Sequence, residues 1–423
     1  MSMTTTGESG GSLGGIHIWD GAEYRGVGRL EWGSGRFTSV GAPAADSASA
    51  PSLEGQPGSD GRTAEDSAFT VVPGLIDTHV HLVGNASDQP ADFLSWPLTT
   101  RPEEQVLHGL AHAQRALRGG VTTVRDLAAD DVQFSLARAL RAGLVTGPRV
   151  LAHGMVSMTA GHGDLFTPPA VAERKSVADG PDACRALVRH WARAGADGIK
   201  IATSGGVLSV GDKAEWRNHT DAELEAIVDE AHALGMRVAA HAHTAAGVDR
   251  ALDAGVDSIE HGTLLEPAQS SRLVELGVTV APTLLINNRI AQGVAANAEQ
   301  AAKAQELVVR RDALLRAAAE SGVDFVLGTD ANGAHVAFGD QMEEIRRMAE
   351  IFGWSPERAL QSATSRAAAA IGWGDTVGML RGGAAADFVV LRGRPWERID
   401  DLDTSNIVAV VAAGQVAAGT LLG

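Results

Sequence analysis

Between Val71 and Gly372, short apolar segments alternate with long helical patterns, and this alternation constrains the fold more than any other feature. Short apolar runs bounded by turn residues are typical of buried strands, while apolar residues repeating every three or four positions indicate helices. We expect strands at residues 75–79, 122–126, 149–153, 198–201, 237–241, 258–261, 279–282 and 324–329. We expect helices at residues 103–118, 181–194, 221–234, 267–276, 303–321, 342–352 and 355–372. Eight strands separated by helices predict a parallel (β/α)8 TIM-type barrel, which we favour over a doubly wound open sheet.

The two ends of the chain share a different pattern, in which short apolar runs alternate with glycine. Residues 15–72 and 373–423 therefore predict short strands, and we expect them to form one small β-sandwich domain beside a barrel of residues 73–372. Residues 1–14 are rich in Gly, Ser and Thr, which predicts a flexible tail. Residues 41–68 consist mainly of Ala, Ser, Gly, Pro and Asp, which predicts a solvent-exposed loop.

Composition argues against several classes of partner. The chain has 35 Lys and Arg residues against 52 Asp and Glu, a formal net charge of −17, so we expect no binding to nucleic acid or to an anionic membrane surface. The single cysteine, Cys184, cannot form an internal disulfide, so nothing calls for an oxidising compartment. We see no apolar run long enough to cross a membrane and no signal peptide, so we expect a soluble, cytoplasmic protein.

The strongest local motif is PGLIDTHVHL at residues 73–82, in which His79 and His81 are separated by one residue. On a strand, residues two apart point to the same side, so both imidazoles can bind one metal ion. The simpler alternative for an isolated His-x-His pair is two polar residues leaving a strand for solvent. In this chain the pair is not isolated.

Ionisable residues stand at the ends of four more predicted strands. Lys200 ends GADGIK, His241 ends RVAAH, His261 ends DSIEH and Asp330 ends FVLGTD. In a closed barrel the carboxyl ends of all strands face one mouth, which is where barrel enzymes place their active sites. The sequence therefore predicts that these side chains converge. A metal site there must use His and carboxylate ligands, because cysteine is almost absent.

This ordered series resembles the metal-dependent amidohydrolase superfamily over nearly the whole chain. The resemblance is carried by PGLIDTHVH near the start of the barrel and GTD near its end. The segments IKIATSGGVLS, AAHAH and SIEHG resemble the branch of Xaa-Pro dipeptidases and related carboxypeptidases, with imidazolonepropionase-like proteins close by. Residues 363–391 resemble the segment that returns the chain from the barrel to the β-sandwich.

The resemblance implies a role for each of these residues. His79, His81 and Asp330 would bind the more buried of two divalent metal ions, and His241 and His261 the more exposed one. Lys200 would carry an N6-carboxylate that bridges both ions, since a plain ammonium group is repelled by cations and offers no lone pair. Ligation by nitrogen and oxygen suits Zn²⁺, with Mn²⁺ or Co²⁺ as alternatives. A metal-bridging hydroxide would attack an amide carbonyl, and Asp330 would move the proton to the leaving nitrogen.

Several residues near these motifs are candidates for contacts with substrate. His162, in the glycine-rich segment MTAGHGD, is expected to bind a developing oxyanion or a substrate carboxylate. The backbone N–H groups of Ser204, Gly205 and Gly206 are weaker candidates, because an SGG sequence is usually only a turn. His243 follows His241 by two residues and stands where the dipeptidase-like branch often has Tyr, a departure that weakens transfer of dipeptide specificity. Arg125 is either a pocket residue or the partner of Asp126 or another carboxylate.

The leading hypothesis is a binuclear hydrolase that cleaves a C–N bond of a small substrate, a dipeptide or an N-acyl amino acid. Xenobiotic amides, carbamates and ureas remain open as substrates. A mononuclear cyclic-amide hydrolase or deaminase is a second hypothesis, which Lys200 disfavours, and a non-catalytic scaffold is a third. We expect a homo-oligomer, and we expect specificity to lie in the loops after the strands, including residues 83–102, 154–180, 205–220 and 284–300.

Overall fold

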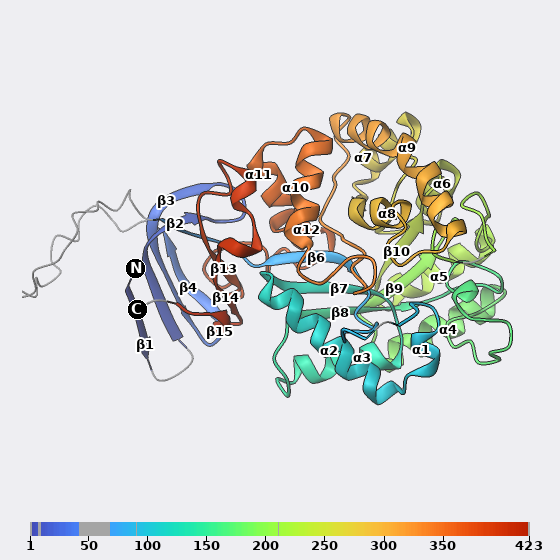
Figure 1. Ribbon diagram of the computed structural model, residues 1–423, viewed down its shortest axis with the longest axis horizontal. Helices are drawn as coiled ribbons and strands as arrows, with labels where there is room; N and C mark the ends of the chain where they lie inside the picture. The colour runs from blue at the N-terminus through green and yellow to red at the C-terminus, as the bar shows by residue number, and fades with distance from the viewer. Residues whose placement is uncertain (1, 7–9, 42–67, 90, 210, 422–423) are drawn as a thin grey trace, which may run out of the picture.

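The computed structural model describes residues 2–6, 10–41, 68–89, 91–209 and 211–421. A barrel of parallel strands surrounded by helices forms the larger part, and a separate sheet built from both ends of the chain lies at its side (Figure 1). In the part of the chain that is described, no helix combines the length and apolar character needed to span a membrane.

The barrel contains seven parallel strands, each hydrogen-bonded to the next one along the chain. They are β6 (Leu75–Val80), β7 (Val121–Ala129), β8 (Arg149–Met155), β9 (Gly198–Ala202), β10 (Arg237–Ala242), β11 (Ser258–His261) and β12 (Thr279–Ala281). Buried aliphatic residues dominate these strands, as expected for strands covered on both faces. The predicted barrel is confirmed, and its strand bounds fall within a few residues of the expected ones.

Residues 324–331 close the barrel, but they do not form the continuous strand that we expected at 324–329. Isolated bridges join Phe325 to Val280 of β12 and Ala331 to Val80 of β6. Between these bridges the backbone N–H of Leu327 donates to the carbonyl of Ser362, 2.9 Å away, instead of to a flanking strand. This contact with the end of helix α11 (Pro356–Ser362) interrupts the ladder, so the eighth position is filled by an irregular segment.

Helices surround the barrel in the order α1 (Trp96–Thr99), α2 (Pro102–Arg118), α3 (Asp131–Arg141), α4 (Pro181–Ala194), α5 (Asp221–Ala233), α6 (Ala245–Ala254), α7 (Pro267–Leu276), α8 (Leu284–Ala291), α9 (Ala298–Glu320), α10 (Gln341–Phe352), α11 (Pro356–Ser362) and α12 (Ser365–Ala370). Single turns of 3-10 helix lie at Asp164–Phe166, Ile399–Asp401 and Thr404–Asn406. Helices α3 and α6 were not anticipated.

Two expectations about helices need correction. Residues 355–372, expected as one helix, form α11 and α12, because the backbone of Thr364 leaves helical geometry. Residues 284–300, expected as a loop, include helix α8. Its first two backbone N–H groups, those of Leu284 and Leu285, donate to the carboxylate of Glu344 on α10, at 2.6 and 2.9 Å. A cap supplied from another helix is invisible in the local sequence.

The second sheet follows the order β15-β14-β13-β5-β2-β3-β4, with β1 paired to β2. Its strands are β1 (Ser2–Thr6), β2 (Gly10–Trp19), β3 (Tyr24–Gly33), β4 (Arg36–Gly41), β5 (Phe69–Pro73), β13 (Phe388–Arg392), β14 (Ile407–Ala412) and β15 (Gln415–Gly419). The rings of Trp32 on β3 and Phe388 on β13 are 5.1 Å apart although their strands are not neighbours, so the sheet folds over its own apolar core. The expected small β-sandwich domain is thus confirmed.

The expected flexible tail at residues 1–14 is wrong where the structure describes it. Residues 2–6 form β1, and residues 10–14 form the start of β2, with Thr4 opposite Ser12 in an antiparallel pair. Antiparallel pairing satisfies backbone N–H and C=O groups of this polar segment, which is why composition misled us. The loop expected at 41–68 lies, apart from its end residues, outside the described residues.

Candidate metal centre

The carboxyl ends of the barrel strands bring the predicted ionisable side chains together. His79 and His81 come from β6, Lys200 from β9, His241 from β10 and His261 from β11, and Asp330 follows the segment that closes the barrel. Side chains of His81, Lys200, His241, His243 and His261 line one cavity of about 300 Å³. Residues far apart in the sequence therefore line one cavity, and Asp330 lies beside its lining residue His81 without being among the lining residues of the described chain.

Three of these residues form a compact first group. His79, His81 and Asp330 offer ligand atoms that all lie within 4.8 Å of one another. Oδ1 of Asp330 lies 3.6 Å from Nε2 of His79 and 3.0 Å from Nε2 of His81. Although burial works against it, the nearby imidazoles and Lys200 lower the pKa of Asp330 to about 2, while burial lowers the pKa of His79 to about 4. The group thus combines an ionised carboxylate with a neutral imidazole.

A second group consists of His241, His243 and His261, whose ligand atoms also lie within 4.8 Å of one another. Each pair of these rings has its centroids 4.6 Å apart. Burial, followed by the charges of neighbouring imidazoles, lowers the pKa of His241 and His261 well below its usual value, and that of His243 to about 3. These rings are neutral at pH 7, so each has one nitrogen lone pair available as a ligand.

Hydrogen bonds hold the rings of this second group. Nδ1 of His261 lies 2.7 Å from Oγ1 of Thr283, and Nδ1 of His243 lies 2.7 Å from Oγ1 of Thr263. Nε2 of His241 lies 3.2 Å from the carbonyl oxygen of Gly205, which can only accept, so this bond leaves the lone pair of His241 on Nδ1. Partners of this kind orient imidazoles for metal binding.

Lys200 lies in the same cavity, and its side chain is buried. Burial lowers the pKa of its amine to about 8, against the pull of Glu260 and Asp330. A lowered pKa increases the fraction of neutral amine at pH 7, and the neutral amine is the form that reacts with CO2. The environment of Lys200 is therefore compatible with a carboxylated lysine.

Two residues of the centre have a strained backbone. The φ angles are +73° at His261 and +58° at Asp330, in the left-handed region that residues other than glycine rarely adopt. Such strain costs on the order of 1–3 kcal/mol per residue and is concentrated at functional sites. The structure thus holds these two side chains in the centre at the expense of stability.

The donor set fits divalent cations. Neutral imidazoles and a carboxylate converge in a buried space, and this combination of nitrogen and oxygen ligands is one that Zn²⁺ accepts and that Mn²⁺ or Co²⁺ also tolerates. Cys184, His219 and Glu223 form a third group outside the cavity. The carboxylate of Glu223 already accepts from the backbone N–H groups of Gly180 and Thr220, which makes this group a helix cap.

Among the candidates for substrate contact, His162 and His243 line the cavity, but Ser204 and Gly205 are not among its lining residues in the described chain. The ring of His162 stacks on that of His241 with centroids 4.0 Å apart. The backbone N–H of Gly205 donates to the carbonyl of Trp216, and the Ser204 hydroxyl donates to the carbonyl of Gly205. The structure therefore brings two of these four residues to the cavity.

Sequence reasoning missed a buried carboxylate, Glu260. Its Oε2 lies 2.9 Å from Nδ1 of His79, and its Oε1 accepts from Nη2 of Arg125 at 2.6 Å. Burial would raise the pKa of Glu260, but Arg125 and His79 hold that pKa well below its usual range. Arg125 therefore pairs with Glu260 rather than with Asp126. Because Glu260 is two residues after the inward-facing Ser258, strand alternation was a signal that could have found it.

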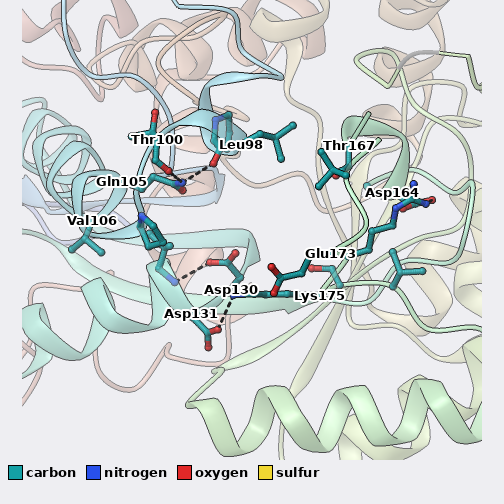
Figure 2. Close-up of a pocket in the computed structure, with 18 of the residues that line it drawn as sticks. Leu98, Thr100, Gln105, Val106, Asp130, Asp131, Asp164, Thr167, Glu173 and Lys175 are labelled. Carbon is teal, nitrogen blue, oxygen red and sulfur yellow. Dashed lines mark hydrogen bonds and ion pairs between the residues drawn. The ribbon is translucent and has the colours of Figure 1, made fainter. Parts of the chain in front are cut away.

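A larger cavity of about 750 Å³ adjoins the first one, and both are lined by Pro97, Gln105, Asp130, Gly163 and Ser176. Figure 2 shows its walls, with Asp130, Asp131 and Glu173 facing it and Lys175 directed towards Asp131. The side-chain amide of Gln105 donates to the carbonyls of Pro97 and Thr100, 2.8 Å from each, and so fixes the segment around α1. Space beyond the histidine cluster is thus available for the rest of a substrate.

Comparison with known proteins agrees with this geometry. The amidohydrolase family profile matches residues 70–419. Ochratoxinase from Aspergillus niger is 33% identical over 351 residues, which cover 78% of this chain and 71% of that protein. Imidazolonepropionase from Deinococcus radiodurans is 27% identical over 378 residues, which cover 81% of this chain and 82% of that protein.

Solved structures give the same result. A Xaa-Pro dipeptidase with methionine bound in its active site is similar to this chain with a TM-score of 0.82 and 30% identity, covering 96% of this chain and 98% of that one. The match spans both the barrel and the small β domain. This chain therefore belongs to the amidohydrolase family and is a hydrolase that acts on carbon–nitrogen bonds.

Proposed function

We propose that this protein is a binuclear metal-dependent hydrolase that cleaves the amide bond of a small substrate with a free carboxylate, either a dipeptide or an N-acyl amino acid. The observation that carries the proposal is a pair of ligand groups, one of His79, His81 and Asp330 and one of His241, His243 and His261. Members of both groups line one cavity together with the buried Lys200. A centre with one ion would not need Lys200 there.

The residues present fit two divalent ions, with Zn²⁺ preferred and Mn²⁺ or Co²⁺ as alternatives. His79, His81 and Asp330 would hold one ion, His241 and His261 the other, and an N6-carboxylated Lys200 would contact both. Bound ions would supply an acidified water molecule and an electrophile for the carbonyl oxygen. The negative charges of Asp330 and of a carboxylated Lys200 would offset part of the charge of the ions.

Asp330 is the residue to which we assign proton transfer. Its Oδ1 lies 3.6 Å from Nε2 of His79 and 3.0 Å from Nε2 of His81, and His81 lines the cavity. As a carboxylate it can accept a proton from water, and as a carboxylic acid it can return that proton to the leaving nitrogen. Protonation of that nitrogen is required because an amide anion is a poor leaving group. His162 and His243 line the same cavity and are assigned to substrate binding.

A cavity of about 300 Å³ is at the small end of the range for ligand sites, which suits a dipeptide or an N-acyl amino acid. The similarity to a Xaa-Pro dipeptidase supports the same class. We further propose a cytoplasmic protein, since the one cysteine, Cys184, is buried and unpaired. We also propose a homo-oligomer, since most soluble oligomers are symmetric assemblies of one chain.

A bulkier xenobiotic amide is the second candidate, and the adjoining cavity of about 750 Å³ favours it. Ochratoxinase, at 33% identity, is a relative named for action on such a compound. A substrate of this kind would place its scissile bond among the histidines and its distal part between α1 and the segment around Glu173.

The test combines metal analysis with a substrate screen. We expect two metal ions per chain and hydrolysis within a panel of dipeptides, N-acyl amino acids, aryl amides and ochratoxin A. The Lys200→Ala variant should bind fewer ions and lose activity, while Lys213→Ala, a change of an exposed lysine, should behave as wild type. Full activity of Lys200→Ala with one ion would contradict the binuclear proposal, and release of ammonia from a purine or pyrimidine would indicate a deaminase instead.

A further inference from the structure

A chain of hydrogen bonds leads from helix α9 to the His162 ring. Nδ1 of His162 lies 2.9 Å from Oγ of Ser209, and Oγ of Ser209 lies 2.7 Å from Oδ2 of Asp212. Oδ1 of Asp212 accepts from the ammonium group of Lys303 on α9, at 3.1 Å. Ser209 and Asp212 are both buried. These residues lie in the segment between β9 and α5, which covers the metal-centre cavity.

The same helix fixes the backbone of this segment. Lys303 also donates to the carbonyl of Ser209 at 2.9 Å, and the side-chain amide of Gln300 donates to the carbonyl of Leu208 at 2.7 Å. The backbone N–H of Gly206 donates to Oδ2 of Asp212 at 2.9 Å. Together these contacts hold Ser209 in its position opposite His162.

For a neutral His162 ring, the chain of bonds has only one consistent arrangement of protons. The oxygens of Asp212 accept from the ammonium group of Lys303, from the backbone N–H of Gly206 and from the Ser209 hydroxyl. The single hydroxyl proton of Ser209 must then be donated to Asp212. Oγ of Ser209 is left to accept, so the donor in the bond to His162 is Nδ1–H. In a neutral imidazole with its proton on Nδ1, Nε2 carries the lone pair.

Nε2 of His162 is free to meet a substrate. Among the described residues it has no hydrogen-bond partner, and the His162 side chain is one of those that line the metal-centre cavity. Stacking on the ring of His241, with an interplanar angle of 20°, prevents the imidazole from turning away. The cavity therefore contains a fixed hydrogen-bond acceptor next to the histidine cluster.

We propose that Lys303, Asp212 and Ser209 act as positioning residues that hold His162 with its proton on Nδ1, so that Nε2 accepts a hydrogen bond from an N–H group of the substrate. This inference rests on the proposed function of the same cavity. It reverses the expectation from sequence that His162 donates to an oxyanion or a carboxylate, because the neutral ring has no proton on the side that faces the cavity.

The part of the substrate that binds Nε2 of His162 is thus an N–H donor close to the scissile carbonyl. In a dipeptide two groups have this chemistry, the N–H of the scissile amide and the α-ammonium group. A scissile bond to proline has no N–H, so the first source would favour ordinary secondary amides over Xaa-Pro bonds. The second source would favour dipeptides over substrates that lack an α-amino group.

The proton position can be measured without turnover. Nitrogen-15 NMR of zinc-loaded protein with labelled histidine distinguishes protonated from unprotonated ring nitrogens, and the His162→Gln variant identifies the His162 signals among those of 14 histidines. We expect an unprotonated Nε2 and a protonated Nδ1 in wild type, and loss of this preference in Ser209→Ala. A protonated Nε2 in the wild-type protein would overturn the proposal, whether or not the protein hydrolyses amides.

Kinetics with matched substrates test whether a substrate N–H group contributes to catalysis, and they show whether it is the scissile amide or the α-ammonium group. One pair differs by N-methylation of the scissile amide, and the other by removal of the α-amino group. We expect wild type to prefer the N–H member of one pair by about tenfold in kcat/KM, the effect of losing one hydrogen bond to a buried acceptor. In Ser209→Ala that ratio should fall towards one, whereas Ser271→Ala, at an exposed site on α7, should keep the wild-type ratio.

A ratio between matched substrates is insensitive to general loss of active protein, so a merely structural role for Ser209 would lower both rates and leave the ratio unchanged. That result, or equal rates within both pairs in wild type, would contradict the inference. Absence of any amide hydrolysis would instead contradict the proposed function, and the NMR measurement would still decide where the proton lies.

Discussion

Nδ1 of His79 lies 2.9 Å from Oε2 of Glu260, and both side chains are almost completely buried. A carboxylate in this position fixes the orientation of the imidazole and leaves Nε2 directed towards Asp330. Glu260 is held in turn by Arg125, which also donates to the carbonyl of Thr78 at 2.6 Å. The proposed metal centre therefore depends on a buried ion pair that does not itself line the cavity.

We expect Glu260→Gln to weaken metal binding by about 10–100-fold, because loss of a partner of a ligating histidine typically has an effect of this size. The amide keeps the size of the side chain but loses its charge. Competition with a chromophoric chelator measures the affinity, at a temperature where circular dichroism shows the variant to be folded. Glu225→Gln, on the exposed face of α5, is the control, and equal affinities for both variants would refute the role of Glu260.

Arg125→Met should destabilise the protein by about 3–5 kcal/mol, since it leaves the buried carboxylate of Glu260 without its partner. The double variant Arg125→Met with Glu260→Gln removes both charges, so part of the lost stability should return. Urea denaturation of the four proteins in this cycle gives the coupling free energy. Additive effects would show that the two residues do not interact.

Thr283→Val should lower metal affinity and kcat/KM together by about 10–100-fold, because the hydroxyl that holds Nδ1 of His261 at 2.7 Å is lost. Thr283 has a φ angle of +47°, and valine is equally β-branched, so the strain of the backbone is kept while the hydrogen bond is removed. Thr279→Val is the matched control, since the Thr279 hydroxyl has no partner among the described residues. Activity equal to that of the control would argue against an orienting role.

Stability should fall as the pH is lowered below about 6.5, and His153 should contribute to this loss. Burial, with Arg125 as the next cause, lowers the pKa of His153 to about 3 in the folded protein, whereas the unfolded chain takes up this proton near pH 6.5. Between these two pKa values the unfolded state binds one more proton than the folded state. The contribution of His153 to the free energy of unfolding is therefore complete above pH 6.5 and decreases by about 1.4 kcal/mol per pH unit below it.

Replacement of His153 by Gln removes this titration, so the dependence of unfolding free energy on pH should become shallower by about one proton. Urea denaturation of chelator-treated wild type and His153→Gln between pH 5 and pH 7.5 measures the difference. Comparison of the two proteins cancels the contribution of the other histidines. Identical slopes would show that His153 is protonated in the folded protein.

The sequence by itself determined the barrel and the identity of the residues at its mouth. Apolar runs of strand length alternating with helical patterns leave few folds to choose from, and parallel strands place their carboxyl ends at one mouth. The period of two along a strand then placed His79 and His81 on one side. Local signals sufficed here because strand direction and side-chain alternation are set within a few residues. The capping box of Thr220 and Glu223, which starts α5, is another signal contained within a few residues of the chain.

Only the tertiary structure decided how these residues meet. His261 and Asp330 join the two ligand groups through left-handed backbone conformations that no local propensity favours, so the surrounding structure must hold them there. Arg125 and Glu260 are 135 positions apart, so their pairing is a property of the closed barrel. The cap on α8 from Glu344, and the orientation of His162 by Ser209, arise in the same way. Such contacts join segments distant in the chain, and a buried polar group can choose its partner only after folding has removed water from both.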